Sequence, residues 1–292
     1  MTAALDESSN TLKGILMIVG AGALLASMDG IGKHLMSDNP VPVVIWARYF
    51  FHALVTFIFL SARGSLGFLR ANRPGLQTLR AVLLLFATGT MYYAISLMPL
   101  ANATAVQFLA PVLVTAFSVP ILGETVGFRR WAAVVAGFFG VVMIVRPGFG
   151  QLEWVSVLPL LTAICLSLYM IMTRIMRTMD RADTTTFYST ATGTIVLSAL
   201  LPLFWETPDS NSWMLMMIMG SAGAMGHYLL IRGFSCASAS FLAPFSYFHL
   251  LSSLPISLFF FGDVPDAWML GGTTLIIGSG LYVWFRESFS RR

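Results

Sequence analysis

Two stretches decide the fold, because they resemble each other: ATAVQFLAPVLVTAFSVPILGETVGFRRW (103–131) and SFLAPFSYFHLLSSLPISLFFFGDVPDAW (240–268). Aligning Gly123 with Gly262 gives an offset of 139 residues, about half of the 292-residue chain. Any two apolar helices that end in a Gly-acid turn look somewhat alike, but the runs that follow also match, at offset 139 or 140. We therefore expect two repeats, residues 1–148 and 149–292.

Apolar runs occupy most of the chain around these stretches. Hydrophobic residues make up 57% of it and charged residues only 10%, whereas a soluble domain carries roughly 25% charged residues. In lipid each span must satisfy its own backbone hydrogen bonds, so the runs must be helices. We expect an all-α polytopic membrane protein of ten transmembrane helices, at about 14–36, 42–62, 79–98, 102–122, 130–146, 154–174, 184–204, 213–232, 238–262 and 267–286.

The number of helices in each repeat determines how the repeats are related. Five is odd, so the second copy enters the membrane the other way up. Inverted five-helix repeats place a substrate site near the membrane midplane, between the halves, and alternating access follows from their pseudo-symmetry.

Basic residues indicate the orientation. With a cytoplasmic N-terminus, 14 of the 17 Lys and Arg residues fall on the cytoplasmic side, and only Lys33, Arg48 and Arg146 fall toward the outside. Cytoplasmic loops of membrane proteins carry this excess. We expect an inner-membrane, multi-pass protein with both termini in the cytoplasm, whose first apolar run is an uncleaved span.

Several functions lack support in the sequence. Neither GxxxxGK[ST] nor HExxH nor GxSxG occurs, and the two cysteines, Cys165 and Cys236, have no metal-binding spacing. We therefore expect no enzyme, no cofactor, no metal and no nucleic-acid partner. The expected partners are a small-molecule substrate and the lipid bilayer. The oligomeric state stays open between a monomer and a larger assembly, since Gly140 could pack the fifth helix within one chain or against another.

Few charged side chains lie inside the spans. Asp29 and Lys33 are four residues apart on the first helix, and Arg48 lies early in the second, toward the outside. They form either a charged outer vestibule or an internal salt bridge that holds two helices together. Because a lysine lies one turn from Asp29 and no other carboxylate lies near the midplane, we expect transport that does not depend strictly on a carboxylate-coupled proton gradient.

Polar residues follow one face of the fourth and ninth runs. Gln107 and Ser246 lie on these faces at the repeat offset of 139, and His249 follows on the second. Such a stripe must face another helix or water, because lipid penalises it. It either joins helices or lines a cavity. We expect a cavity, with six candidate substrate-binding residues: Tyr92, Gln107, Tyr169, His227, Ser246 and His249.

The stretches PLANATAVQFLAPVLVTAFSVPILGETVGFRRWAAVVAGFFGVVMIVRPG and LAPFSYFHLLSSLPISLFFFGDVPDAWMLGGTTLIIGSGLYVWFRES resemble the two halves of EamA-type proteins of the drug/metabolite transporter superfamily. MDGIGKHL and IWARYFF resemble the first two helices of that family. Within the superfamily the chain resembles YddG-type amino-acid exporters. The resemblance implies ten helices, cytoplasmic termini, a central cavity and export of aromatic and other hydrophobic amino acids. Asp263 stands where many relatives have Glu.

The sequence therefore predicts an exporter that works by alternating access around a midplane cavity. Its expected substrates are amino acids, above all aromatic and hydrophobic ones. One alternative is the same fold moving another metabolite or a drug-like cation. Another is a membrane scaffold that transports nothing, which would need no buried polar stripes.

Overall fold

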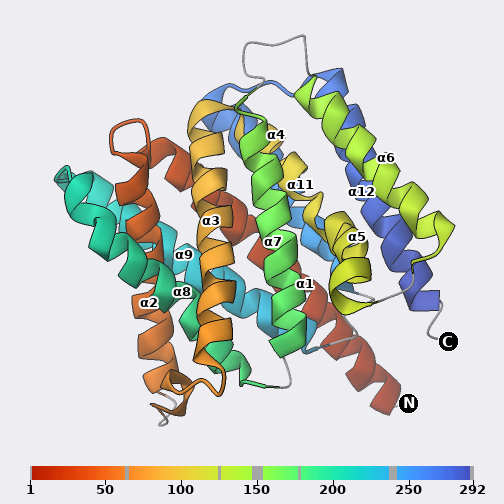
Figure 1. Cartoon of the computed structure of the whole chain (residues 1–292), viewed down its shortest axis with the longest axis horizontal. Helices are drawn as coiled ribbons and strands as arrows, with labels where there is room; N and C mark the ends of the chain where they lie inside the picture. Colours follow the sequence, from red (N-terminus) through yellow and green to blue (C-terminus); the bar gives the residue numbers. More distant parts are fainter. Residues whose placement is uncertain are drawn as a thin grey trace.

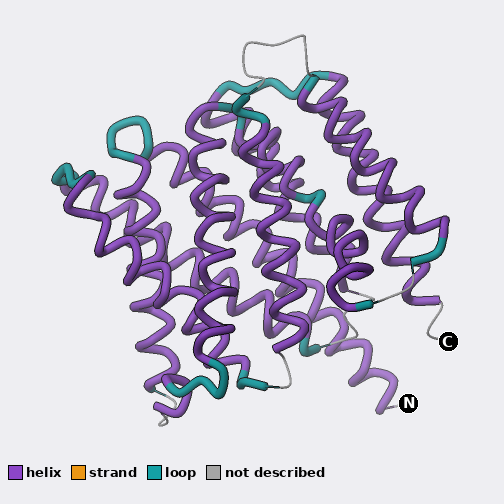
Figure 2. The backbone as a smooth tube through the Cα atoms, in the orientation of Figure 1, coloured by secondary structure: helices purple, strands orange, loops and turns teal. Residues whose placement is uncertain are grey.

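A computed structural model describes residues 2–62, 66–123, 126–146, 154–176, 179–236 and 242–289. All the regular structure in these residues is helical (Figures 1 and 2). The helices of the first half are α1 (Thr2–Leu35), α2 (Val41–Ser61), η1 (Leu66–Leu69), α3 (Pro74–Leu97), α4 (Leu100–Gln107), α5 (Ala110–Leu122) and α6 (Phe128–Val145). Those of the second half are α7 (Val157–Met176), α8 (Ala182–Leu200), η2 (Leu201–Leu203), α9 (Ser210–Phe234), η3 (Ala243–Tyr247), α11 (Phe248–Phe261) and α12 (Ala267–Phe289).

Eight helical segments of the described chain are long and apolar enough to cross a membrane, and α6 adds a shorter apolar stretch, Trp131–Val145. The chain is thus a multi-pass membrane protein. Both termini lie at the lower end of the bundle in Figure 1, which we call the terminal end; it also carries residues 66–73 and 179–181. The opposite, distal end carries the connections 36–40, 98–99 and 204–209.

The fourth and ninth spans are broken, which the single runs predicted at 102–122 and 238–262 missed. Residues 108–109 separate α4 from α5, and the short 3₁₀ helix η3 precedes α11. Pro111 explains the first break, because it cannot donate to the Gln107 carbonyl and its ring crowds that carbonyl. Pro244 lies within η3 in the second. Each polar stripe predicted from sequence therefore crosses a change of helix geometry.

The helices pair in a pattern that is the same when the halves are exchanged. α1 packs along α9 as α7 packs along α3, and α1 packs on α11 as α7 packs on α4 and α5. α2 packs on α8, and α6 packs on α12, each against its own counterpart. Two related five-helix halves would produce this pattern; their inversion across the membrane stays a prediction.

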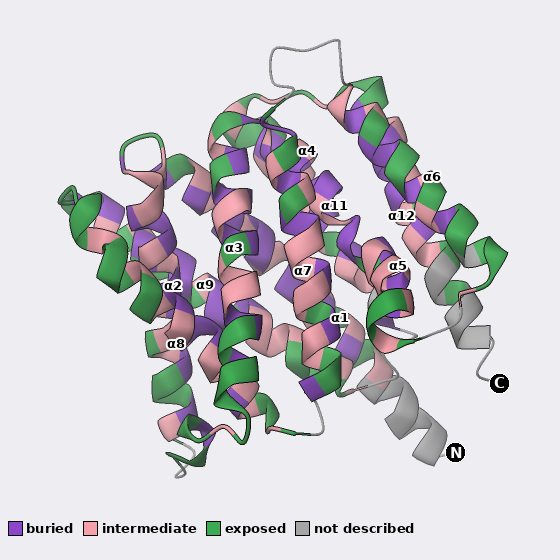
Figure 3. Ribbon diagram, viewed as in Figure 1, coloured by how far each residue is buried: buried purple, intermediate pink, exposed green. Residues whose placement is uncertain are grey.

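Small residues allow α6 and α12 to pack closely. A β-carbon on Gly140 of α6 would lie 2.7 Å from the carbonyl oxygen of Gly272 on α12, closer than such atoms pack. Gly140 thus joins two helices of the same chain. Buried residues face the interior of the bundle, and exposed ones, mostly apolar, cover its outside (Figure 3), as expected for a surface in contact with lipid.

Candidate functional site

A cavity of about 500 Å³ lies among α2, α3, α7, α8 and α9. It reaches from Arg48 and Thr88 in the middle of their helices to Asp180 and Ala182 at the terminal end. Its wall is mostly apolar, with a few polar side chains. These polar side chains include Arg48, Tyr49, His52, Arg80, Tyr169 and His227.

Arg48 is a cation of this wall with few partners for its donors. Its Nε–H donates to the Met28 sulfur at 3.4 Å, and thioether sulfur is a weak acceptor. The guanidinium lies over the Tyr92 ring, 5.0 Å from its centroid. Within the described residues it makes no other hydrogen bond and no ion pair with a carboxylate. A half-buried cation with donors to spare therefore faces the cavity.

Arg80 is a second cavity cation, and its surroundings differ. It is wholly buried on α3, where its guanidinium donates to the Thr185 carbonyl at 2.5 Å, to Ser189 Oγ at 2.7 Å and to Thr173 Oγ1 at 3.2 Å. The Tyr169 ring lies 4.9 Å from it. These contacts tie α3 to α7 and α8, so Arg80 has a structural role that Arg48 lacks.

Two histidines lie between this cavity and a smaller one of about 300 Å³. His52 and His227 line both, and their ring centroids are 5.1 Å apart. His227 Nδ1–H donates to the Gly223 carbonyl at 2.9 Å, which in the neutral ring leaves Nε2 as an acceptor. Phe59 and Tyr228 make the smaller cavity largely apolar.

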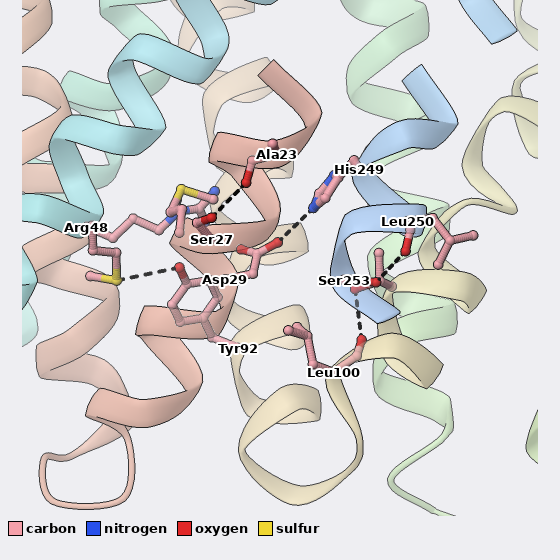
Figure 4. Close-up of polar contacts among 12 residues, drawn as sticks. Ala23, Ser27, Asp29, Arg48, Tyr92, Leu100, His249, Leu250 and Ser253 are labelled. Carbon is pink, nitrogen blue, oxygen red and sulfur yellow. Dashed lines mark hydrogen bonds and ion pairs between the residues drawn. The ribbon is translucent and has the colours of Figure 1, made fainter. Parts of the chain in front are cut away.

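A buried acidic group lies behind Arg48. Asp29 of α1 is 5% exposed, and its Oδ2 lies 3.2 Å from Nε2 of His249 on α11. Figure 4 shows the Asp29 carboxylate between Arg48 on one side and His249 on the other. Arg48 and Asp29 also interact electrostatically.

The distal side of this region is held by a separate ion pair. Lys33 Nζ lies 3.6 Å from an Asp263 carboxylate oxygen and donates to the Met98 carbonyl at 2.7 Å. The Phe261 ring lies 5.1 Å from the same ammonium. These contacts join the distal ends of α1, α3 and α11, whereas the cavity reaches the terminal end.

Three sequence-based expectations about charge need correction. Asp29 contacts His249 and Lys33 pairs with Asp263, so the two residues join helices but do not pair with each other. Arg48 lines the cavity rather than an outer vestibule. Arg80, one of the 14 basic residues expected on the cytoplasmic side, lies buried inside α3. Helical spacing predicted which residues share a face, but the partners come from segments more than 60 residues away.

The six candidate residues fall in three places. Tyr169 and His227 line the cavity. Tyr92 stacks on Arg48, and His249 pairs with Asp29, so both lie directly behind the wall. Gln107 lies at the end of α4 and Ser246 lies in η3, so each is at a helix break, and neither lines the cavity of about 500 Å³. Their part in binding stays a prediction.

Comparison with known proteins agrees with a membrane-transport site. The S-adenosylmethionine uptake transporter of Rickettsia conorii is 28% identical over 92% of this chain and 94% of its own length. The riboflavin transporter of Rhizobium johnstonii is 26% identical over 96% and 94%, and the pseudopaline exporter of Pseudomonas aeruginosa is 25% identical over 90% and 93%.

One solved structure shares the fold. A protein crystal structure with 22% sequence identity superposes with a TM-score of 0.65, covering 97% of this chain and 99% of the other. The model of the EamA-like transporter family matches residues 12–146 and again 153–285. The chain therefore belongs to the EamA-like transporter family.

Proposed function

We propose that this chain transports small amphiphilic molecules that carry a carboxylate, with aromatic and hydrophobic amino acids foremost, by alternating access around the central cavity. The observation that carries the proposal is Arg48. A guanidinium that is half-buried in a largely apolar wall and bonded only to a thioether lacks the partners that stabilise a buried charge. A carboxylate can supply them, because it accepts two parallel N–H bonds from arginine.

The rest of the wall suits the other parts of such a substrate. Tyr49 and Tyr169 offer aromatic faces near Arg48 and Arg80. The neutral His227 ring presents Nε2, an acceptor for an ammonium group. The smaller apolar cavity beyond His52 and His227 could take a hydrophobic side chain. A cavity of about 500 Å³ is within the range of small-molecule sites.

The same charges weigh against a drug-like cation as substrate. Two arginines face the cavity from α2 and α3, and Asp180 at its terminal end is one opposing carboxylate. A substrate with positive charge alone would be repelled near Arg48. A scaffold that transports nothing would have no need of an unsatisfied guanidinium in a cavity.

A second candidate is S-adenosylmethionine or a related amino-acid derivative. Relatives named as its uptake transporters are 28% identical over nearly the whole chain, and the molecule combines an amino-acid carboxylate with a flat base. Export stays our prediction for the direction, although the relatives include proteins named for uptake and one named for export.

The symmetric pairing of helices supports alternating access by two related halves. Ten spans in the inner membrane with both termini in the cytoplasm are part of the proposal, and the orientation rests on the distribution of Lys and Arg. In that orientation the cavity reaches toward the cytoplasm, and the Lys33–Asp263 pair closes the outside.

Counterflow in liposomes tests the proposal. Vesicles preloaded with unlabelled phenylalanine, tryptophan, S-adenosylmethionine, riboflavin or phenethylamine would be assayed for uptake of the same compound in labelled form. We expect exchange of at least one carboxylate-bearing compound above the level of protein-free vesicles, and its loss in Arg48→Gln. Exchange of phenethylamine or riboflavin alone would overturn the carboxylate assignment, and exchange of none would overturn transport of these classes.

A further inference from the structure

Asp29 is an unusual residue for its position. Of the described carboxylates, it alone lies deep within a candidate span; Asp183 begins α8 at its first turn. A charged group at that depth is costly and is usually retained for function. Its partner His249 belongs to the residue type that changes charge between about pH 5 and pH 8. The Asp29 side chain is 7% exposed and the His249 side chain is 13% exposed.

We propose that the Asp29–His249 pair is a proton-binding site linked to the substrate site: a proton on the pair and a carboxylate on Arg48 bind cooperatively. This inference rests on the proposed function. With neutral His249, Nε2–H donates to the Asp29 carboxylate, which keeps its full negative charge. A proton taken from water by the other ring nitrogen gives an imidazolium, and the pair becomes neutral overall.

Arg48 provides the link between the two sites. Asp29 lies within electrostatic reach of Arg48, so its carboxylate partly offsets the arginine's charge when His249 is neutral. A substrate carboxylate must then approach Arg48 against Asp29. Protonation of the pair removes that competition and raises the affinity for the substrate. By linkage, bound substrate raises the proton affinity of the pair by the same factor.

His249 also lies where a change in its charge can affect the packing of the helices. It is the second residue after the η3–α11 break, and its backbone nitrogen would lie 2.7 Å from a β-carbon on Gly22 of α1. Its ring meets Phe108 from the other helix break, with centroids 5.8 Å apart. A charge change at His249 thus acts where α1 meets both breaks.

Other groups around the pair could give a pH response of their own. α4 contributes no titratable residue, and the neighbouring elements present Lys33 on α1, Arg48 and His52 on α2, Tyr92 on α3, His227 on α9 and Tyr247 at the end of η3. Of these, His52 and His227 are of the same residue type as His249. The experiment must separate them from the pair.

The test measures binding of phenylacetate, a carboxylate with no ammonium, to purified protein between about pH 5 and pH 8. We expect the affinity of the wild type to fall about tenfold as the pH rises. Asp29→Asn should bind tightly at every pH, because no charged carboxylate then lies near Arg48 to oppose the substrate. His249→Gln should bind weakly at every pH, because Asp29 stays charged. His52→Asn, His227→Asn and His34→Gln should each keep the pH dependence.

A flat profile in the wild type overturns the inference, and so does a pH dependence that Asp29→Asn retains. Loss of the dependence in His52→Asn or His227→Asn instead assigns it to the cavity histidines. Absence of phenylacetate binding to wild type and Asp29→Asn at every pH overturns the carboxylate site itself, and with it this inference. Melting temperatures of each variant show that the protein is folded in every comparison.

Discussion

Phe108 and Tyr247 are 139 residues apart, the offset of the sequence repeat, and their rings are in contact with centroids 5.2 Å apart. Each lies at the break of its span, so equivalent residues of the two halves meet where both helices change geometry. Contact between equivalent residues is expected near a pseudo-two-fold axis. This joint lies beside His249, and we expect the halves to move relative to each other about it.

Replacing Gly123 or Gly262 by alanine should lower the free energy of unfolding by the same amount. Both end a broken span with positive φ, 68° and 70°, and a β-carbon at either would meet no atom within 4 Å. The cost is therefore backbone strain alone, about 1–2 kcal/mol each. Denaturant titration of both variants should give equal losses of unfolding free energy, with Gly75→Ala as an unstrained control. A loss in only one would contradict the repeat.

Arg80→Gln should mainly reduce stability. It removes charge-assisted bonds that join α3 to Thr185 and Ser189 on α8, worth about 2–3 kcal/mol together. The exposed Arg70→Gln is the matched control and should leave the unfolding free energy nearly unchanged. Folded Arg80→Gln should lose much less substrate affinity than Arg48→Gln. Equal affinity losses with unchanged stability would mean that Arg80 is the principal carboxylate ligand.

Breaking the Lys33–Asp263 pair should open the distal end more often. A partly exposed pair of this kind contributes about 1 kcal/mol, or about a fivefold shift in population. In a background without Cys165 and Cys236, a cysteine at Thr88 would be labelled from the distal side about fivefold faster in Asp263→Asn. Asp266→Asn, which breaks the nearby pair with Arg146, should not change the rate. Equal rates in both variants would argue against a closing role for Lys33.

Asp209 should make stability depend on acidity. It caps α9, and hydrogen bonds from the Ser212 side chain and from its backbone N–H, 2.7 Å from Oδ1, lower the pKa of Asp209 below its ordinary 3.8. This contribution is therefore present above the unfolded-state pKa and is lost as pH falls through the folded one. Asp209→Ala should have a lower melting temperature than wild type at neutral pH. The difference in melting temperature should shrink as the pH falls below the ordinary aspartate pKa of 3.8. A difference that is constant with pH would exclude the cap.

Hydropathy and the repeat predicted much of the architecture because both depend on local properties. The Gly-acid turns and the apolar runs could be anticipated from residue type and spacing, whereas the packing of Gly140 was left open between one chain and two. The breaks at 108–109 and η3 were missed, although Pro111 signalled the first. A proline is tolerated in many membrane helices, so it does not by itself say where a span breaks.

The site was only partly predictable, because its partners come from distant segments. Tyr169 and His227 were found from polar spacing on apolar helices. Arg48 was expected toward the outside and Arg80 on the cytoplasmic side; both lie near predicted span ends, where arginine usually reaches water. Only the packing of α2 and α3 against the second half shows that both guanidiniums turn inward, and nothing local distinguishes the satisfied Arg80 from the unsatisfied Arg48.

The central claim is that Arg48 recognises a carboxylate, and the most direct measurement compares L-phenylalanine with its amide, which lacks that charge. Their dissociation constants would be determined for wild type and Arg48→Gln. We predict that wild type prefers the acid, that Arg48→Gln weakens its binding about 10- to 100-fold, and that binding of the amide hardly changes. Equal affinities of wild type for acid and amide, or equal losses of both in Arg48→Gln, would contradict the account.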